Sequence, residues 1–144
     1  MKDEDMAGFL GRRDFSIKEY IIDFVRNSKH FNSNSENLDR AKALLIFSTS
    51  KQQTWIVSTN ERLYCILEDN RKDDPHINWS IPKKDLINNN EISIIITTDE
   101  DYKEEIGLIS FGKEHKNWLY SKKLFKNSDH LRYEVQRLIK ESML

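Results

Sequence analysis

The sequence predicts a mainly β fold with flanking helices: a seven-stranded, bent antiparallel barrel, capped by a C-terminal α-helix and preceded by an N-terminal amphipathic helix. Two observations predict it. From Lys42 onward, seven short runs rich in apolar and β-branched residues are separated by turn-forming polar residues. Apolar residues at helical spacing stand before the first run and after the last. Parallel strands would need crossovers of about a dozen residues, so the short turns favour an antiparallel meander.

The first helix is expected over residues 16–25, with an end near residue 27. Ser16 and Glu19 form a capping box at its start, and Phe15 and Tyr20 occupy the positions of a hydrophobic staple. A helix this short is unstable alone in water, so its apolar face must be buried against the barrel or against a second copy of the chain. The apolar face of this candidate association helix consists of Ile17, Tyr20, Ile21, Phe24 and Val25.

The stretch after His30 is rich in Asn and Ser and is too polar to bury much, which is typical of a linker. We therefore expect residues 1–40 to form a tail, the first helix and a linker, and residues 41–144 to form the barrel with its terminal helix. A chain of 144 residues fits one domain with a single core.

The expected strands end at turn-forming residues, and Pro82, which has no N–H for the ladder, should end the fourth. "KKDL", residues 83–86, then makes a turn. The apolar runs place the seven strands at 42–49, 54–59, 62–68, 77–81, 92–98, 106–111 and 117–125.

"DHLRYEVQRLIKES", residues 129–142, predicts the C-terminal helix, with Ser128 as its N-cap. An open meander leaves one end uncovered, and an amphipathic helix that arrives last can cover it. The face expected to plug the barrel consists of Leu131, Val135, Leu138, Ile139 and Ser142.

Two stretches resemble bacterial pleckstrin-homology-like (PH-like) domains. "WIVSTNERLYCIL", residues 55–67, is similar to the second and third strands of those domains, in which an apolar strand runs into Thr-Asn-x-Arg and a second apolar strand. "WSIPKKDL", residues 79–86, is similar to the short strand and Ile-Pro turn that follow. The resemblance covers about residues 40–142 and implies a seven-stranded barrel capped by a C-terminal helix.

The same resemblance implies a non-catalytic interaction domain, since bacterial PH-like domains generally bind proteins and often assemble with themselves. The partner would be a protein, with a second copy of the chain among the candidates. Phosphoinositide-binding members carry several basic residues along the first two strands and their loop. Between Ala43 and Glu61 this chain has Lys51 alone, which is too little charge to clamp a multiply phosphorylated headgroup.

Composition and motifs exclude several classes of function. The longest apolar runs are too short to span a bilayer, and the acidic N-terminus lacks the pattern of a signal peptide, so the expected location is the cytoplasm. The single cysteine, Cys65, predicts a buried thiol, and the four histidines lack metal-ligand spacing. Phosphate-binding and hydrolase motifs are absent from the sequence. We expect no catalytic activity, no cofactor, no metal and no small-molecule substrate.

Charge is divided unevenly, with a net charge of −4 over residues 41–112 and +4 over residues 113–144. Cations and aromatic rings are interleaved near the start of the second part, a mixture that binds nucleic-acid backbones, anionic membranes or acidic proteins. A strand with one solvated face gives the same composition. The alternative function is therefore an anion-surface binder that acts through Lys113, Lys116, Trp118, Tyr120, Lys122, Lys123 and Lys126.

"DEDYKEE", residues 99–105, concentrates five carboxylates in an expected hairpin tip. Its spacing does not match an EF-hand loop, which needs alternating ligands, a Gly and a distant Glu. A solvated turn, weak Ca²⁺ binding and a basic partner all remain open for this segment.

Overall fold

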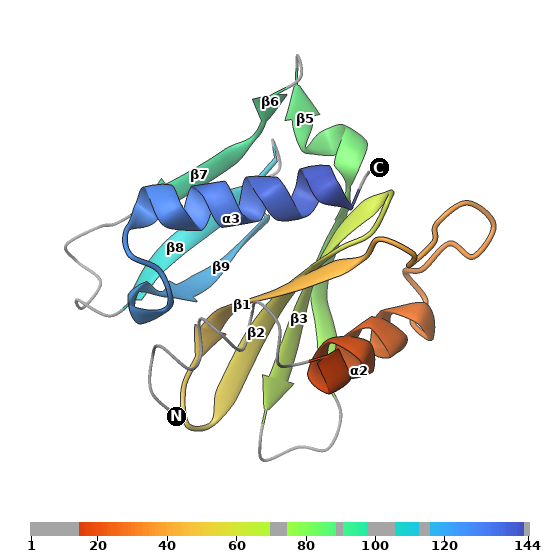
Figure 1. Cartoon of the computed structure of the whole chain (residues 1–144), viewed down its shortest axis with the longest axis horizontal. Helices are drawn as coiled ribbons and strands as arrows, with labels where there is room; N and C mark the ends of the chain where they lie inside the picture. The colour runs from red at the N-terminus through yellow and green to blue at the C-terminus, as the bar shows by residue number, and fades with distance from the viewer. Residues whose placement is uncertain (1–14, 70–74, 89–90, 98–105, 113–115, 143–144) are drawn as a thin grey trace.

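The computed structural model describes residues 15–69, 75–88, 91–97, 106–112 and 116–142, without the side chains of residues 15–18 and 88. Its helices are α2 (Phe15–Arg26) and α3 (Ser128–Glu141), and short 3-10 turns lie at Lys83–Asp85 and Lys122–Leu124 (Figure 1). The strands are β1 (Lys42–Ser48), β2 (Gln52–Ser58), β3 (Arg62–Asp69), β4 (His76–Pro82), β5 (Ile87–Asn88), β6 (Glu91–Ile92), β7 (Ile94–Thr97), β8 (Ile106–Phe111) and β9 (Lys116–Ser121).

The fold is mainly β, as predicted, and its two larger sheets are antiparallel. One sheet has the order β1-β2-β3-β4, the other has the order β7-β8-β9, and β5 and β6 form a small hairpin between them. Within the described residues the two sheets do not pair into one closed barrel. They meet where β1 ends, because the backbone N–H of Ser48 donates to Ser121 Oγ on β9 at 3.0 Å.

The four-stranded sheet is buried on both faces. Five consecutive residues are buried in each of β1, β2 and β3. Neighbouring side chains on a strand point to opposite faces, and two polar contacts identify what covers each face. Ser58 contacts Ser142 at the end of α3, whereas Tyr64, which pairs with Val57, donates to Glu36 in the 27–41 segment.

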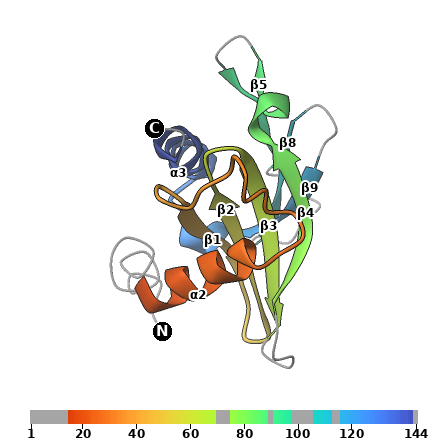
Figure 2. The same ribbon diagram turned by 90° about the vertical axis from the view of Figure 1, so that its right-hand side faces the viewer.

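The outer cover of this sheet comes from the N-terminal part of the chain. Ile21 and Val25 of α2 are fully buried, and α2 packs against β1 (Figures 1 and 2). The 27–41 segment continues along the sheet and is fastened at the β2–β3 turn, where the backbone N–H of Asn37 donates to Asn60 Oδ1 at 2.8 Å. In this structure, α2 therefore packs against the four-stranded sheet of its own chain.

The three-stranded sheet is covered on one face only. In β8 the side chains alternate, with Ile109 and Phe111 buried and Leu108 and Ser110 half-buried. The buried face meets the four-stranded sheet, since the rings of Trp79 and Phe111 pack 5.5 Å apart. On the other face, the described side chains of β8 are half-buried, and Ile95 of β7 is 50% exposed.

Helix α3 has the apolar face that the sequence predicts: Leu131, Val135, Leu138, Ile139 and Ser142 are all buried. The prediction of Ser128 as N-cap is wrong, because the helix begins at Ser128 and Asn127 Oδ1 accepts the backbone N–H of His130 at 2.8 Å. Asn and Ser are about equally good caps, so propensity does not separate neighbours of this kind.

Six of the seven expected strands are present with small shifts at their ends, whereas the expected strand 92–98 is split: Ile92 belongs to β6, which pairs with β5, and β7 begins at Ile94. The seventh stops at Ser121 instead of residue 125, because Lys122–Leu124 turn into a 3-10 helix before α3. The β5–β6 hairpin was not predicted, since Ile87 and Ile92 stand alone among polar residues. The first helix begins at Phe15, so Ser16 lies in its first turn instead of before it, and the side chains of the expected capping box fall partly outside the described residues.

Candidate protein-binding surface

Strand β7 forms an edge of the three-stranded sheet: within the described residues it pairs with β8 alone. Its inward side chain Ile94 is buried, while its neighbour Ile95 is 50% exposed. Such an edge carries backbone N–H and C=O groups that can pair with another chain. An exposed apolar residue on an edge strand adds a side-chain contact to that pairing.

A groove with a volume of about 460 Å³ runs between this edge and α3. Arg132 Nη1 donates to the carbonyl oxygen of Ile94 at 2.8 Å, so that carbonyl points toward the helix and away from β8. Backbone groups alternate in direction along an antiparallel strand, so those of Ile96 also point away from β8. The groove is lined by Glu91, Ile92, Ser93 and Ile94 and, from α3, by Arg132, Gln136 and Lys140.

The three α3 residues of the groove are spaced four apart and form one row along the helix. Two of them, Arg132 and Lys140, are cations, and the groove contains one carboxylate, that of Glu91. The arrangement fits an extended segment that pairs with β7 and carries acidic side chains. The sequence did not predict this groove, because its lining residues come from two distant segments, 91–94 and 132–140, that only the fold brings together.

The basic–aromatic segment is not one surface in the structure. Trp118 and Tyr120 pair with Ile109 and Gly107 and lie on the core side of the sheet. Tyr120 is 2% exposed, and its ring occupies the space where a Cβ at Gly107 would lie. Among the predicted lysines, Lys116 and Lys122 are half-buried, Lys123 and Lys126 are exposed, and Lys113 lies outside the described residues.

The candidate association helix has its apolar face mostly against its own sheet. Ile21 and Val25 are buried, Phe24 is half-buried and Tyr20 is 45% exposed. The side chain of Ile17 lies outside the described residues, as does the acidic 99–105 segment.

A buried carboxylate lies between the 27–41 segment and the sheet. Glu36 is 4% exposed, although the sequence predicted a polar linker there. Tyr64 donates its hydroxyl to both carboxylate oxygens, at 2.9 and 2.8 Å, and Thr59 donates to one of them. The backbone N–H of Asn32 donates to Oε1 at 3.0 Å. Burial and the neighbouring Glu36 carboxylate raise the pKa of Tyr64 above its usual value.

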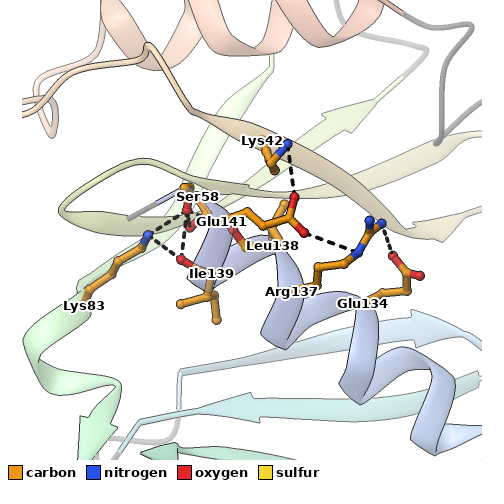
Figure 3. Close-up of polar contacts among 9 residues, drawn as sticks. Lys42, Ser58, Lys83, Glu134, Arg137, Leu138, Ile139 and Glu141 are labelled. Carbon is orange, nitrogen blue, oxygen red and sulfur yellow. Dashed lines mark hydrogen bonds and ion pairs between the residues drawn. The ribbon is translucent and has the colours of Figure 1, made fainter. Parts of the chain in front are cut away.

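A second buried charge, Lys83, lies near the end of α3 and is 3% exposed. Its Nζ donates to the carbonyl oxygen of Ile139 at 2.9 Å and to Ser142 Oγ at 2.7 Å, and Ser142 also contacts Ser58 (Figure 3). A cation at a helix C-terminus satisfies carbonyls that have no partner in the helix. Burial lowers the pKa of Lys83 to about 8, an effect that Glu36 partly offsets.

Sequence patterns offered only an indirect signal for these two charges. Thr59 and Tyr64 lie on either side of the β2–β3 turn. Both are buried, and buried hydroxyls need hydrogen-bond partners. That requirement predicts a partner for them without saying that it comes from residue 36. Lys83 lies in an expected turn, where lysines are normally solvated.

Cys65 is buried, as predicted, and burial raises the pKa of its thiol to about 12. In the described part of the chain, no three His, Cys, Asp or Glu side chains come together as a metal site. Neither described helix is long and apolar enough to cross a membrane.

No family model, no curated protein and no solved structure matches this chain. The proposed function therefore rests on the geometry of the chain.

Proposed function

We propose that this chain is a non-catalytic scaffolding module with a PH-like architecture, and that it associates with a second copy of itself along β7. The PH-like part is supported by the hairpin and Ile-Pro motifs, together with the order of four strands, three strands and a terminal helix. The observation that carries the association is the β7 edge, which has exposed Ile95 and faces the α3 groove.

Antiparallel pairing of two β7 strands brings complementary charges together. Residues that follow Thr97 in one copy would run beside residues that precede Ile94 in the other, and the groove lies there. The sequence after Thr98 is "DEDYKEE", which carries five carboxylates, and the groove carries the cations Arg132 and Lys140. A two-fold axis makes both contacts at once, as in other isologous dimers.

Sedimentation equilibrium of the purified chain tests the proposal. The wild type should show a concentration-dependent dimer that weakens as salt is raised, because the charge contacts are partly exposed. Ile95→Lys places a cation on the edge and should weaken dimerisation about tenfold or more, as edge lysines do in natural sheets. Lys140→Glu should weaken it through the groove alone.

Ser110→Lys is the matched control, because Ser110 lies opposite Ile95 on the same face but not on the edge. It should leave the dimer unchanged if β7 pairs through its backbone. A wild-type chain that stays monomeric over a wide concentration range at low salt would refute self-association. A dimer that is equally insensitive to Ile95→Lys and Lys140→Glu would refute the β7 assignment.

The alternative, an anion-surface binder based on residues 113–126, loses the aromatic part of its argument. Tyr120 is buried and Trp118 lies on the core side of β9, so neither ring forms an open stacking platform. The exposed lysines of that segment remain an ordinary cationic surface.

A further inference from the structure

Three polar side chains from separate parts of the chain converge at the outer side of β4. His30 comes from the 27–41 segment, Arg62 from β3 and Ser80 from β4. Ser80 Oγ lies 3.0 Å from His30 Nδ1, and Arg62 Nη2 donates to the same oxygen at 3.1 Å. A single neutral hydroxyl therefore sits between an imidazole and a guanidinium group.

The guanidinium group of Arg62 has no carboxylate partner in the part of the chain that the structure describes, where each ion pair joins other residues. Its Nε is buried and makes no hydrogen bond. Arginine presents a fork of N–H donors, and here one nitrogen of that fork is unused. A cation without a carboxylate partner and with an unused N–H donor can bind an anion by charge and by hydrogen bonding.

The buried carboxylate of this neighbourhood, that of Glu36, is engaged by other donors. Glu36 is buried and accepts hydrogen bonds from Tyr64, Thr59 and the backbone of Asn32. The Tyr64 hydroxyl that bonds to Glu36 also lies 3.4 Å from the carbonyl oxygen of His30.

The cluster is also reachable from solvent. His30 is exposed, and Arg62 and Ser80 are half-buried. A tetrahedral oxyanion approaching from the His30 side could accept hydrogen bonds from the guanidinium fork, from the Ser80 hydroxyl once it rotates, and from the imidazole. Arginine recognises phosphate oxygens with charge-assisted hydrogen bonds, and the buried Nε of Arg62 can join them once the guanidinium group turns toward the ligand.

We propose that His30, Arg62 and Ser80 form a binding site for a phosphate-type oxyanion, either free phosphate or a phosphate monoester. This site lies apart from the β7 groove and does not depend on the proposed self-association. Because His30 belongs to the 27–41 segment and the other two residues belong to the sheet, a bound anion bridges them. Occupancy should stabilise the docked segment by the ordinary linkage of binding to folding.

Nitrogen-15 NMR of the full chain tests the site directly. Adding inorganic phosphate at constant ionic strength should shift the Arg62 Nε–H and His30 ring resonances along one saturable curve. O-phosphoserine, added separately, distinguishes the sources: tighter binding than phosphate indicates a monoester, and equal binding indicates the free anion. The thermal midpoint should rise in the same titrations.

Arg62→Gln should weaken phosphate binding about tenfold or more, as expected for a lost charge-assisted pair. His30→Gln provides a second variant at an exposed position, should Arg62→Gln unfold. Arg40→Gln, which removes an exposed cation of the same segment, is the matched control and should leave binding unchanged. A wild-type chain without saturable shifts, or shifts of equal size in both His30→Gln and Arg40→Gln, would overturn the proposal.

Discussion

The two sheets of this protein are built from similar β-branched sequence but bury it differently. In β3, Leu63 through Leu67 are all buried, whereas β8 alternates between buried and half-buried residues. The difference arises from the N-terminal part of the chain, since α2 and the 27–41 segment cover the outer face of one sheet, whereas the outward side chains of β8 in the other sheet stay half-buried. A partner can add contacts at β7, where Ile95 is half-exposed and Arg132 occupies one outward carbonyl, while the four-stranded sheet is covered by the chain itself.

The largest expected effect is at the helix that both sheets share. Leu138 is 6% exposed, and Leu138→Asp would bury a charge without a partner. We expect a loss of about 4 kcal/mol or more in the free energy of unfolding, measured by urea denaturation, out of a typical ~5–15 kcal/mol. A cooperative transition with an unchanged midpoint would contradict the role of α3 as the cap.

Two isoleucine-to-alanine substitutions compare the covered face of the first sheet with the more exposed face of the second. Ile21→Ala on the covered side should cost about 2–4 kcal/mol, because Ile21 is fully buried. Ile95→Ala on the open side should cost about 0.5 kcal/mol or less, because half of Ile95 is already solvated. Equal losses for the two variants in urea denaturation would show that α2 does not cover the sheet in solution.

The lowered pKa of Lys83 should make the stability of the fold depend on pH in the alkaline range. Its pKa in the folded chain is lowered to about 8, so above that pH the unfolded chain binds more protons than the folded chain. Lys83 alone should therefore add about 2 kcal/mol of stability between about pH 8 and pH 9.5, and the raised thiol pKa of Cys65 removes part of that gain, because the folded chain keeps a thiol proton that the unfolded chain loses. Above about pH 10 the raised pKa of Tyr64 reverses the sign, since the folded chain then retains its proton.

Lys83→Met is the control for that pH dependence. The variant keeps most of the side-chain volume and should lose the rise: its stability should fall between about pH 8 and pH 9.5 in urea titrations, because the raised thiol pKa of Cys65 then acts alone. The same rise in wild type and variant would assign the pH dependence to other groups.

The smallest effect is expected in the turn after β9. Replacing the exposed Lys123 and Lys126 by Gln should change the free energy of unfolding by less than about 0.5 kcal/mol, since exposed charges contribute little. Co-sedimentation with anionic vesicles and binding to single-stranded DNA measure the functional side. Strong wild-type binding that this variant loses would restore the anion-surface alternative.

Sequence patterns located nearly all of the secondary structure, because each strand is a short apolar run and α3 has a clear helical period. They offered α2 as one candidate cover for the outer face of the first sheet but did not indicate that the 27–41 segment packs there. Five consecutive buried residues in β2 imply two covered faces, but the cover includes Glu36 and Asn37 in a stretch whose composition is that of a linker. Polar groups that are buried by mutual hydrogen bonding leave no hydrophobic signal, so Glu36, Lys83 and the Arg62 cluster were missed.

The buried Glu36 determines where this chain can be shortened. A boundary at residue 41, which composition suggests, would remove the partner of Tyr64 and Thr59 and uncover one side of the four-stranded sheet. The resulting fragment would expose a contiguous apolar surface and two unpaired hydroxyls, a combination that favours aggregation over folding. Proteases should therefore spare residues 27–41 in the native chain despite their polar composition. The smallest unit that folds should begin before α2, and fusion partners or labels belong ahead of residue 15.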